Sequence, residues 1–187
     1  MCEKEGSVYM QSELPIRKHP RLKGYDYGIC GGYFITICVK NRESMLGEVV
    51  GRDVFIAPTV QLSEYGNIID KHINIINSLG KGVFVDKYVI MPNHVHMIIL
   101  LENEMQDCSN GAMCGAGNGA MKTSRPTTTI PNLLRSFKTM VSKEIGFSLW
   151  QTSYHDHIIR SKEEYRKIWN YIDENPGRWR DDKYYNK

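Results

Sequence analysis

Stretches rich in β-branched and aromatic residues alternate along this chain with stretches whose apolar residues recur at helical spacing. The second kind predicts three helices, over residues 62–79 with Ser63 as N-cap, over 132–145 and over 162–175. The first kind predicts strands over 33–39, 54–56, 83–85, 88–90 and 97–101, and an extended segment over 150–159. Strands interrupted by helices in this order are typical of an α+β domain, an antiparallel sheet covered by helices.

The length of 187 residues fits one domain of this kind. Residues 103–129 differ from the rest because they are rich in Gly, Ala and Thr and contain Asn-Gly-Ala-Met twice. Such a stretch buries little apolar surface, so we expect a flexible insertion. The chain is therefore divided into a basic N-terminal arm over 1–32, one domain over 33–182 with this insertion, and a tail over 183–187.

Cysteine content and hydropathy limit the compartment. The five cysteines include no Cys-x-x-Cys pair, so neither a disulfide framework nor a classical zinc module is expected. No apolar run approaches the roughly 20 residues that cross a bilayer, and the N-terminus does not read as a secretory signal. These features predict a cytoplasmic protein without a membrane partner.

The net charge is only +3, so an anionic partner has to be argued from where the cations lie. One cluster is in the N-terminal arm and contains Arg17, Lys18, Arg21 and Lys23. A second group lies on the polar face of the 132–145 helix and contains Arg135, Lys138, Thr139 and Ser142. Cations and hydroxyls in a row suit a phosphate backbone. A solvated arm and a solvated helix face are the alternatives.

The segment Met91-Pro92-Asn93-His94-Val95-His96 carries the most specific chemical signal. In a strand, His94 and His96 project to the same side, about 6–7 Å apart at Cα, while Val95 points to the opposite layer. Two such imidazoles can chelate one cation, or they can simply lie on a solvent face. A second pair, His155 and His157, has the same spacing, and spacing alone does not choose between the pairs.

The last predicted helix contributes two further polar groups. Tyr171 and Asn175 are four residues apart, so they share a stripe at the edge of the apolar face. A tyrosine can act as a covalent nucleophile, and an amide oxygen can complete a mixed His/oxygen metal site. A packed tyrosine and a residue that merely ends the helix before Pro176 are the alternatives.

Five motifs occur in a fixed order: Arg17–Tyr27, Tyr33–Cys38, Met91–His96, Trp150–Arg160 and Tyr171–Pro176. Together they resemble the single-tyrosine HUH transposases, and within these the REP-associated tyrosine transposases. HUH denotes two His around a bulky apolar residue, which here is Val95. The resemblance runs from about residue 15 to about residue 182.

The resemblance implies a ferredoxin- or RRM-like antiparallel sheet with the His pair on a central strand. It implies a transposase that nicks single-stranded DNA beside a hairpin and rejoins strands through a 5′-phosphotyrosine, with Mg²⁺ or Mn²⁺ as cofactor. Carried over, Tyr171 is the nucleophile, and His94, His96 and Asn175 are metal ligands. His157 would contact DNA or support the metal ligands from behind. The basic arm and the polar helix face supply the other candidate DNA contacts, Arg17, Lys18, Arg21, Lys23, Arg135, Lys138 and Ser142. Family members include monomers and homodimers, so both states stay open, as does the chain that supplies Tyr171.

Two other functions are compatible with the sequence. An RRM-like domain that binds structured nucleic acid without cleaving it would use sheet aromatics such as Tyr33 and the basic helix face. A small metallohydrolase would need three or four protein ligands, and one His pair falls short of that number.

Overall fold

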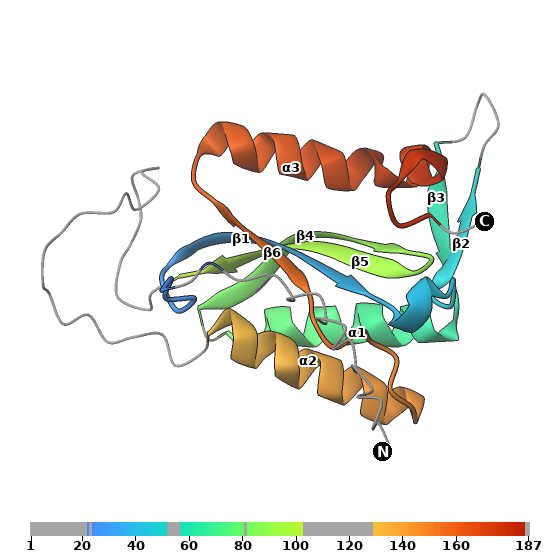
Figure 1. Ribbon diagram of the computed structural model, residues 1–187, viewed down its shortest axis with the longest axis horizontal. Helices are drawn as coiled ribbons and strands as arrows, with labels where there is room; N and C mark the ends of the chain where they lie inside the picture. Colours follow the sequence, from blue (N-terminus) through green and yellow to red (C-terminus); the bar gives the residue numbers. More distant parts are fainter. Residues whose placement is uncertain (1–21, 23, 52–56, 81, 103–128, 186–187) are drawn as a thin grey trace, which may run out of the picture.

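The computed structural model describes residues 22, 24–51, 57–80, 82–102 and 129–185. Within them, four strands form one antiparallel sheet (Figure 1). In order across the sheet they are β4 (Val83–Met91), β5 (His94–Leu101), β1 (Gly31–Cys38) and β6 (His155–Ile159). Strand β5, which carries the His pair, is therefore central.

Three α-helices cover the sheet, and Figure 1 shows α1 and α2 on one face and α3 on the other. Their bounds are Glu64–Ser78 for α1, Ile130–Ile145 for α2 and Lys162–Glu174 for α3. The main-sheet strands and the helices α1 and α2 follow the order βαββαβ, which is the ferredoxin-like arrangement. The predicted α+β fold is confirmed.

Smaller elements complete the described fold. The short strands β2 (Gly47–Val50) and β3 (Thr59–Leu62) form a separate antiparallel hairpin. Two 3₁₀ segments are η1 (Lys40–Arg42) and η2 (Asn175–Asp181). None of the helices in the described ranges is long and apolar enough to cross a membrane.

The predicted elements agree with the structure except at particular boundaries. Ser63 is the N-cap of α1, and its side chain accepts a hydrogen bond from the amide of Gly66, as expected. The two predicted strands over 83–90 are one strand with an irregularity between Val85 and Lys87. Helix α3 does end before Pro176, but the chain continues as η2 instead of leaving the domain. The 54–56 strand, and the 103–129 insertion apart from Thr129, lie outside the described residues.

Alternation along the strands gives the sheet two different faces. On β1 and β5, Ile35, Ile37, Val95 and Met97 are fully buried in the main core, against α1 and α2. Their neighbours face α3, where a smaller apolar cluster contains Ile98, Ile159 and Ile172. His94 and His96 therefore lie on the α3 side, and Val95 lies in the opposite layer as predicted.

Leu46 ties the start of α1 to the turn that precedes the His pair. Its buried amide donates a 2.8 Å hydrogen bond to the carbonyl of Pro92, and its carbonyl accepts a 2.9 Å bond from the Ser63 amide. Gly66, in the first turns of α1, packs directly against this carbonyl and leaves no space for a Cβ. The glycine thus lets α1 approach the Leu46 backbone closely, and Leu46 in turn holds the turn at Pro92 that leads into β5.

We predict that Gly66→Ala destabilises the protein by about 1–3 kcal/mol, because its Cβ would overlap the Leu46 carbonyl. Helix propensity alone predicts the opposite, a gain of roughly 1 kcal/mol. Urea unfolding measures the change, with Asn67→Ala at the next, exposed position of α1 as control. A Gly66→Ala protein as stable as the native chain would show that the contact does not constrain the fold.

Candidate metal and nucleophile site

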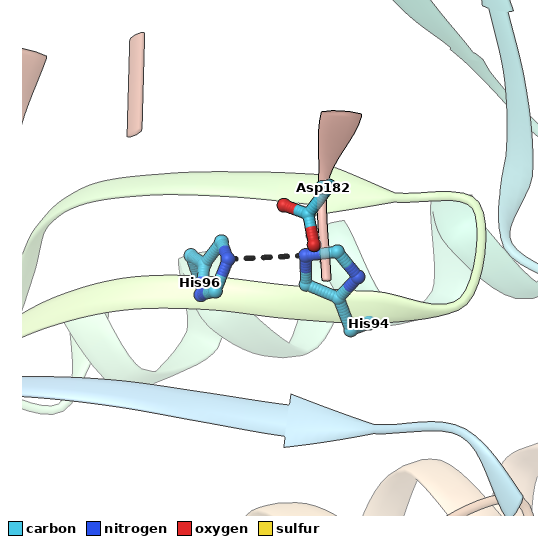
Figure 2. Close-up of side chains that lie close together, drawn as sticks. All are labelled: His94, His96 and Asp182. Atoms are coloured by element: carbon cyan, nitrogen blue, oxygen red, sulfur yellow. Dashed lines mark hydrogen bonds between the residues drawn. The ribbon is translucent and has the colours of Figure 1, made fainter. Parts of the chain in front are cut away.

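The two imidazoles of β5 meet on the face of the sheet below α3. His94 and His96 are almost completely buried, and their Nε2 atoms are 3.0 Å apart (Figure 2). Two ligands at about 2.1 Å from one ion and at right angles to each other are separated by about 3 Å. The spacing of the two nitrogens therefore fits coordination of a single cation.

A carboxylate lies beside the two imidazoles. Asp182 follows η2, and Figure 2 shows its side chain directed at the His pair. One ligand atom from each of His94, His96 and Asp182 lies within 4.8 Å of the other two. Imidazole nitrogens and a carboxylate oxygen are a donor set that divalent transition metals accept. These three side chains could hold a metal ion.

Neighbouring groups orient the imidazoles. The amide nitrogen of Asn93 donates to the carbonyls of Arg42, at 3.1 Å, and Tyr184, at 2.7 Å, so its amide oxygen faces His94 Nδ1 at 2.8 Å. An amide oxygen only accepts, so His94 Nδ1 carries the proton and Nε2 presents its lone pair. His96 Nδ1 is 2.8 Å from the hydroxyl of Thr36. Such contacts are the usual means of orienting metal-binding histidines.

Burial keeps both imidazoles neutral. It lowers the pKa of His94 to about 4, an effect that Asp182 opposes and Lys183 and Arg42 reinforce. Burial also lowers the pKa of His96 well below 6.5, and the neighbouring His94 adds to this. Neutral imidazoles are the form that binds metal. Both side chains are therefore ready to bind a cation at neutral pH.

Tyr171 reaches the same place from α3. Its hydroxyl is 3.2 Å from His96 Nε2 in the same chain, and its ring packs edge-on against Phe34. The side chain is 37% exposed, so solvent and a substrate can approach it. Burial first, and then the charges of Asp182 and Tyr184, raise the pKa of Tyr171 to about 12. The phenol is protonated at neutral pH.

Asn175 lies close to the two imidazoles and Tyr171, and its side chain hydrogen-bonds to the carboxylate of Asp182. Its side chain is 1% exposed, and its Nδ2 donates a 3.1 Å hydrogen bond to Asp182 Oδ2. Its Oδ1 is buried without a hydrogen-bond partner. The helical backbone of Asn175 (φ −58°, ψ −41°) continues through the position before Pro176, which local sterics disfavour.

Sequence reasoning missed Asp182 and Tyr184. The ring of Tyr184 packs on both imidazoles, with centroid distances of 4.6 Å to His94 and 5.9 Å to His96. No spacing rule links these residues to the His pair more than 80 positions earlier. The residues predicted as a tail, 183–187, thus include one that is buried against the site. The acidic pair Asp181-Asp182 after the last helix was the one available signal.

The predicted phosphate-binding row on α2 is assembled, but away from the His pair. Arg135, Lys138, Thr139 and Ser142 line a cleft of about 500 Å³ together with Trp150. Helix α2 covers the opposite face of the sheet from Tyr171 (Figure 1). The amino group of Lys138 donates to the carbonyls of Gln151 and Ser153 at 2.7 and 2.9 Å, so this cation also holds the following loop.

The remaining predicted residues fall in three places. His155 and His157 lie on the exposed edge strand β6, where His157 Nε2 is 2.6 Å from Glu164. Thus β5 carries the pair that meets Asp182. The sites at Arg17, Lys18, Arg21 and Lys23 lie outside the described residues. The expectation that Tyr33 offers its ring to bases is wrong, because Tyr33 is fully buried and its hydroxyl donates to the carbonyl of Ile29.

Comparison with known proteins supports the fold first. The solved structure of a REP-associated tyrosine transposase bound to a REP hairpin superposes with a TM-score of 0.57. That match has 19% identity and covers 85% of this chain and 73% of the transposase. This chain therefore has a transposase fold.

The sequence has a nearer relative. An uncharacterized protein of Haemophilus influenzae is 35% identical over 176 residues, which cover 90% of this chain and 93% of the relative. The chain belongs to the same family as that protein. No family model matches the chain.

We predict that acid destabilises the protein through the buried imidazoles. Their pKa values lie below 6.5 when folded and return to about 6.5 on unfolding, so the unfolded chain binds more protons. Their contribution is complete above pH 6.5 and is lost as the pH falls toward about 4. Between pH 7 and pH 5 we expect a loss on the order of 2 kcal/mol from His94, and His96 changes the stability in the same direction.

Urea unfolding in EDTA at the two pH values measures this loss. The double variant His94→Gln/His96→Gln should lose less stability between pH 7 and pH 5 than the native chain. His155→Gln, at an exposed position of β6, is the matched control and should behave as the native chain does. An equal loss in all three proteins would contradict the prediction.

Proposed function

We propose that this protein is a metal-dependent single-stranded DNA nickase and strand transferase that acts beside hairpins. The observation that carries the proposal is the position of the Tyr171 hydroxyl, 3.2 Å from His96 Nε2 and beside a His-His-Asp cluster. A nucleophile next to a cation site is the arrangement that phosphoryl transfer to a tyrosine requires.

In the proposed reaction, Tyr171 Oη attacks the phosphorus of a phosphodiester. The new O–P bond forms as the bond to the 3′ oxygen breaks, and the proton lost by the phenol is balanced by the one gained by the 3′ oxygen. The products are a 5′-phosphotyrosine and a free 3′-OH. Attack of a 3′-OH on this linkage reverses the step, so strands can be rejoined without ATP.

His94 and His96 would hold the Mg²⁺ or Mn²⁺ ion, because both are neutral and their Nε2 atoms converge. A bound divalent ion would polarise a phosphate oxygen and offset the charge that develops on the phosphoryl group. Asn93 and Thr36 fix the two rings for this task. Asn175, the predicted further ligand, lies next to Tyr171 and Asp182.

For the DNA, we propose contacts from two regions of positive charge. One is the α2 row of Arg135, Lys138 and Ser142 along its cleft, and the other is the arm with Arg17, Lys18, Arg21 and Lys23. His157, on the α3 side of β6, would contact the strand that approaches Tyr171. Residues 33–182 would then form the catalytic domain, with residues 1–32 adding phosphate contacts.

We predict that Tyr171→Phe reduces the covalent adduct to background. The protein is incubated with Mn²⁺ and a hairpin-bearing single strand labelled at its 3′ end in one reaction and at its 5′ end in another. A 5′-phosphotyrosine retains the 3′-labelled fragment on the protein in a denaturing gel, and the 5′-labelled fragment is released.

Tyr184→Phe is the matched control, since Tyr184 also contacts both imidazoles and its variant should still form the adduct. An adduct that survives in Tyr171→Phe and is lost in Tyr184→Phe would show that Tyr184, and not Tyr171, is the nucleophile. Salt-sensitive hairpin binding by the native chain, with no adduct under any metal condition, would favour the non-cleaving RRM-like binder.

We predict a separable effect on DNA affinity. Arg135→Ala should weaken hairpin binding and reduce the slope of log K against log salt by roughly 0.7–0.9, the value for one lost phosphate contact. Lys143→Ala, on α2 but outside the cleft, should leave the slope unchanged. Equal slopes for both variants would place the phosphate contacts elsewhere.

A further inference from the structure

Asp182 is held in place more firmly than its position beyond the last helix suggests. Its Oδ2 accepts a 3.1 Å hydrogen bond from Asn175 Nδ2, and its Oδ1 accepts a 2.7 Å bond from the Tyr184 amide. These two donors bind opposite oxygens of one carboxylate, so the group cannot rotate freely. A carboxylate fixed in this way beside two converging imidazoles is arranged as a ligand.

The orientation of Asn175 argues against its own amide being the ligand. A hard cation binds an amide oxygen, never the amide nitrogen. The Asn175 side chain directs its amide nitrogen toward the Asp182 carboxylate, because the opposite orientation would place the amide oxygen against that carboxylate. The amide oxygen is left buried and unpartnered instead.

Charge favours the same assignment. Two neutral imidazoles leave the full charge of a divalent ion uncompensated inside a buried site, and a carboxylate offsets part of it. Two His and one carboxylate also leave open coordination positions, which a substrate oxygen can fill. A neutral amide in the third position would provide no such compensation.

We propose that Asp182 is the third metal ligand of this site and that Asn175 is a positioning residue that holds Asp182. The inference rests on the proposed function only for the presence of the ion. This assignment departs from the pattern of the single-tyrosine HUH transposases, in which the polar residue four positions after the tyrosine completes the metal site.

The test is Mn²⁺ binding to the full-length protein without DNA, measured by calorimetry and by the spin-resonance signal of free Mn²⁺. Asp182→Ala and Asp182→Asn should each weaken binding by about 100-fold or more, and Asn175→Ala by about 10-fold. Asp182→Asn keeps the side-chain shape, so it separates loss of charge from loss of packing. Thermal unfolding in EDTA checks that each variant is folded.

The double variant Asp182→Ala/Asn175→Ala gives the sharpest distinction. If Asn175 acts only through Asp182, the double variant binds Mn²⁺ as weakly as Asp182→Ala alone. If Asn175 is itself a ligand, the two losses add. Additive losses, or a larger loss for Asn175→Ala than for Asp182→Ala, would overturn the proposal.

The outcome can be separated from that of the proposed function. Unchanged Mn²⁺ affinity in Asp182→Ala, with adduct formation at Tyr171 intact in the native chain, refutes the ligand assignment and leaves the nickase standing. Mn²⁺ binding that depends on Asp182, without any adduct in the native chain, supports the ligand assignment and refutes the nickase. His94→Ala/His96→Ala serves as the reference for loss of the site.

Discussion

The close approach of two uncharged imidazole nitrogens, 3.0 Å apart in a buried layer, is the constraint on which the site depends. Both nitrogens cannot offer lone pairs at that distance without repulsion, unless a proton or a cation lies between them. In the structure a neutral tautomer of His96 supplies that proton, because its Nε2–H can donate to His94 Nε2 while its Nδ1 accepts from the Thr36 hydroxyl. A cation bound at this point would take the place of that proton, and the neighbouring carboxylate of Asp182 could join it as a ligand.

The fold supplies this contact from a strand that is paired on both sides. Strand β5 is central in the sheet, so it is paired on both sides, and its Val95 is anchored in the main core between the two imidazoles. Asn93 and Thr36 then orient the rings from the preceding turn and the adjacent strand. The flanking groups, Tyr171 and Asp182, come from α3 and from the end of η2. The two imidazoles on β5 are therefore the fixed reference, and the C-terminal segment is positioned against them.

Several sequence predictions were wrong or incomplete because they depend on which elements pack against each face of the sheet. The period of apolar residues along one strand or helix does not contain that information. The sequence pattern predicts an accessible ring for Tyr33, but its position on β1 places it on the α1 and α2 side, where packing buries it. The helical period places Lys138 among candidate phosphate-binding cations, and in the structure it also donates to backbone carbonyls of a loop that sequence spacing does not bring near. The β2–β3 hairpin is short and only partly buried, so its strands carry a weak alternation signal.

The amino-acid sequence by itself determined the succession of the main-sheet strands and the helices, the α+β class, and the projection of His94 and His96 to one side of a strand. These follow from local rules, since strand and helix periods decide which side chains share a face. Only the tertiary structure decided that Tyr171 meets His96 in the same chain and that Asp182 and Tyr184 join them. Those contacts join residues 75 to 90 positions apart, and the packing of α3 and η2 on the sheet determines them, which no local period encodes.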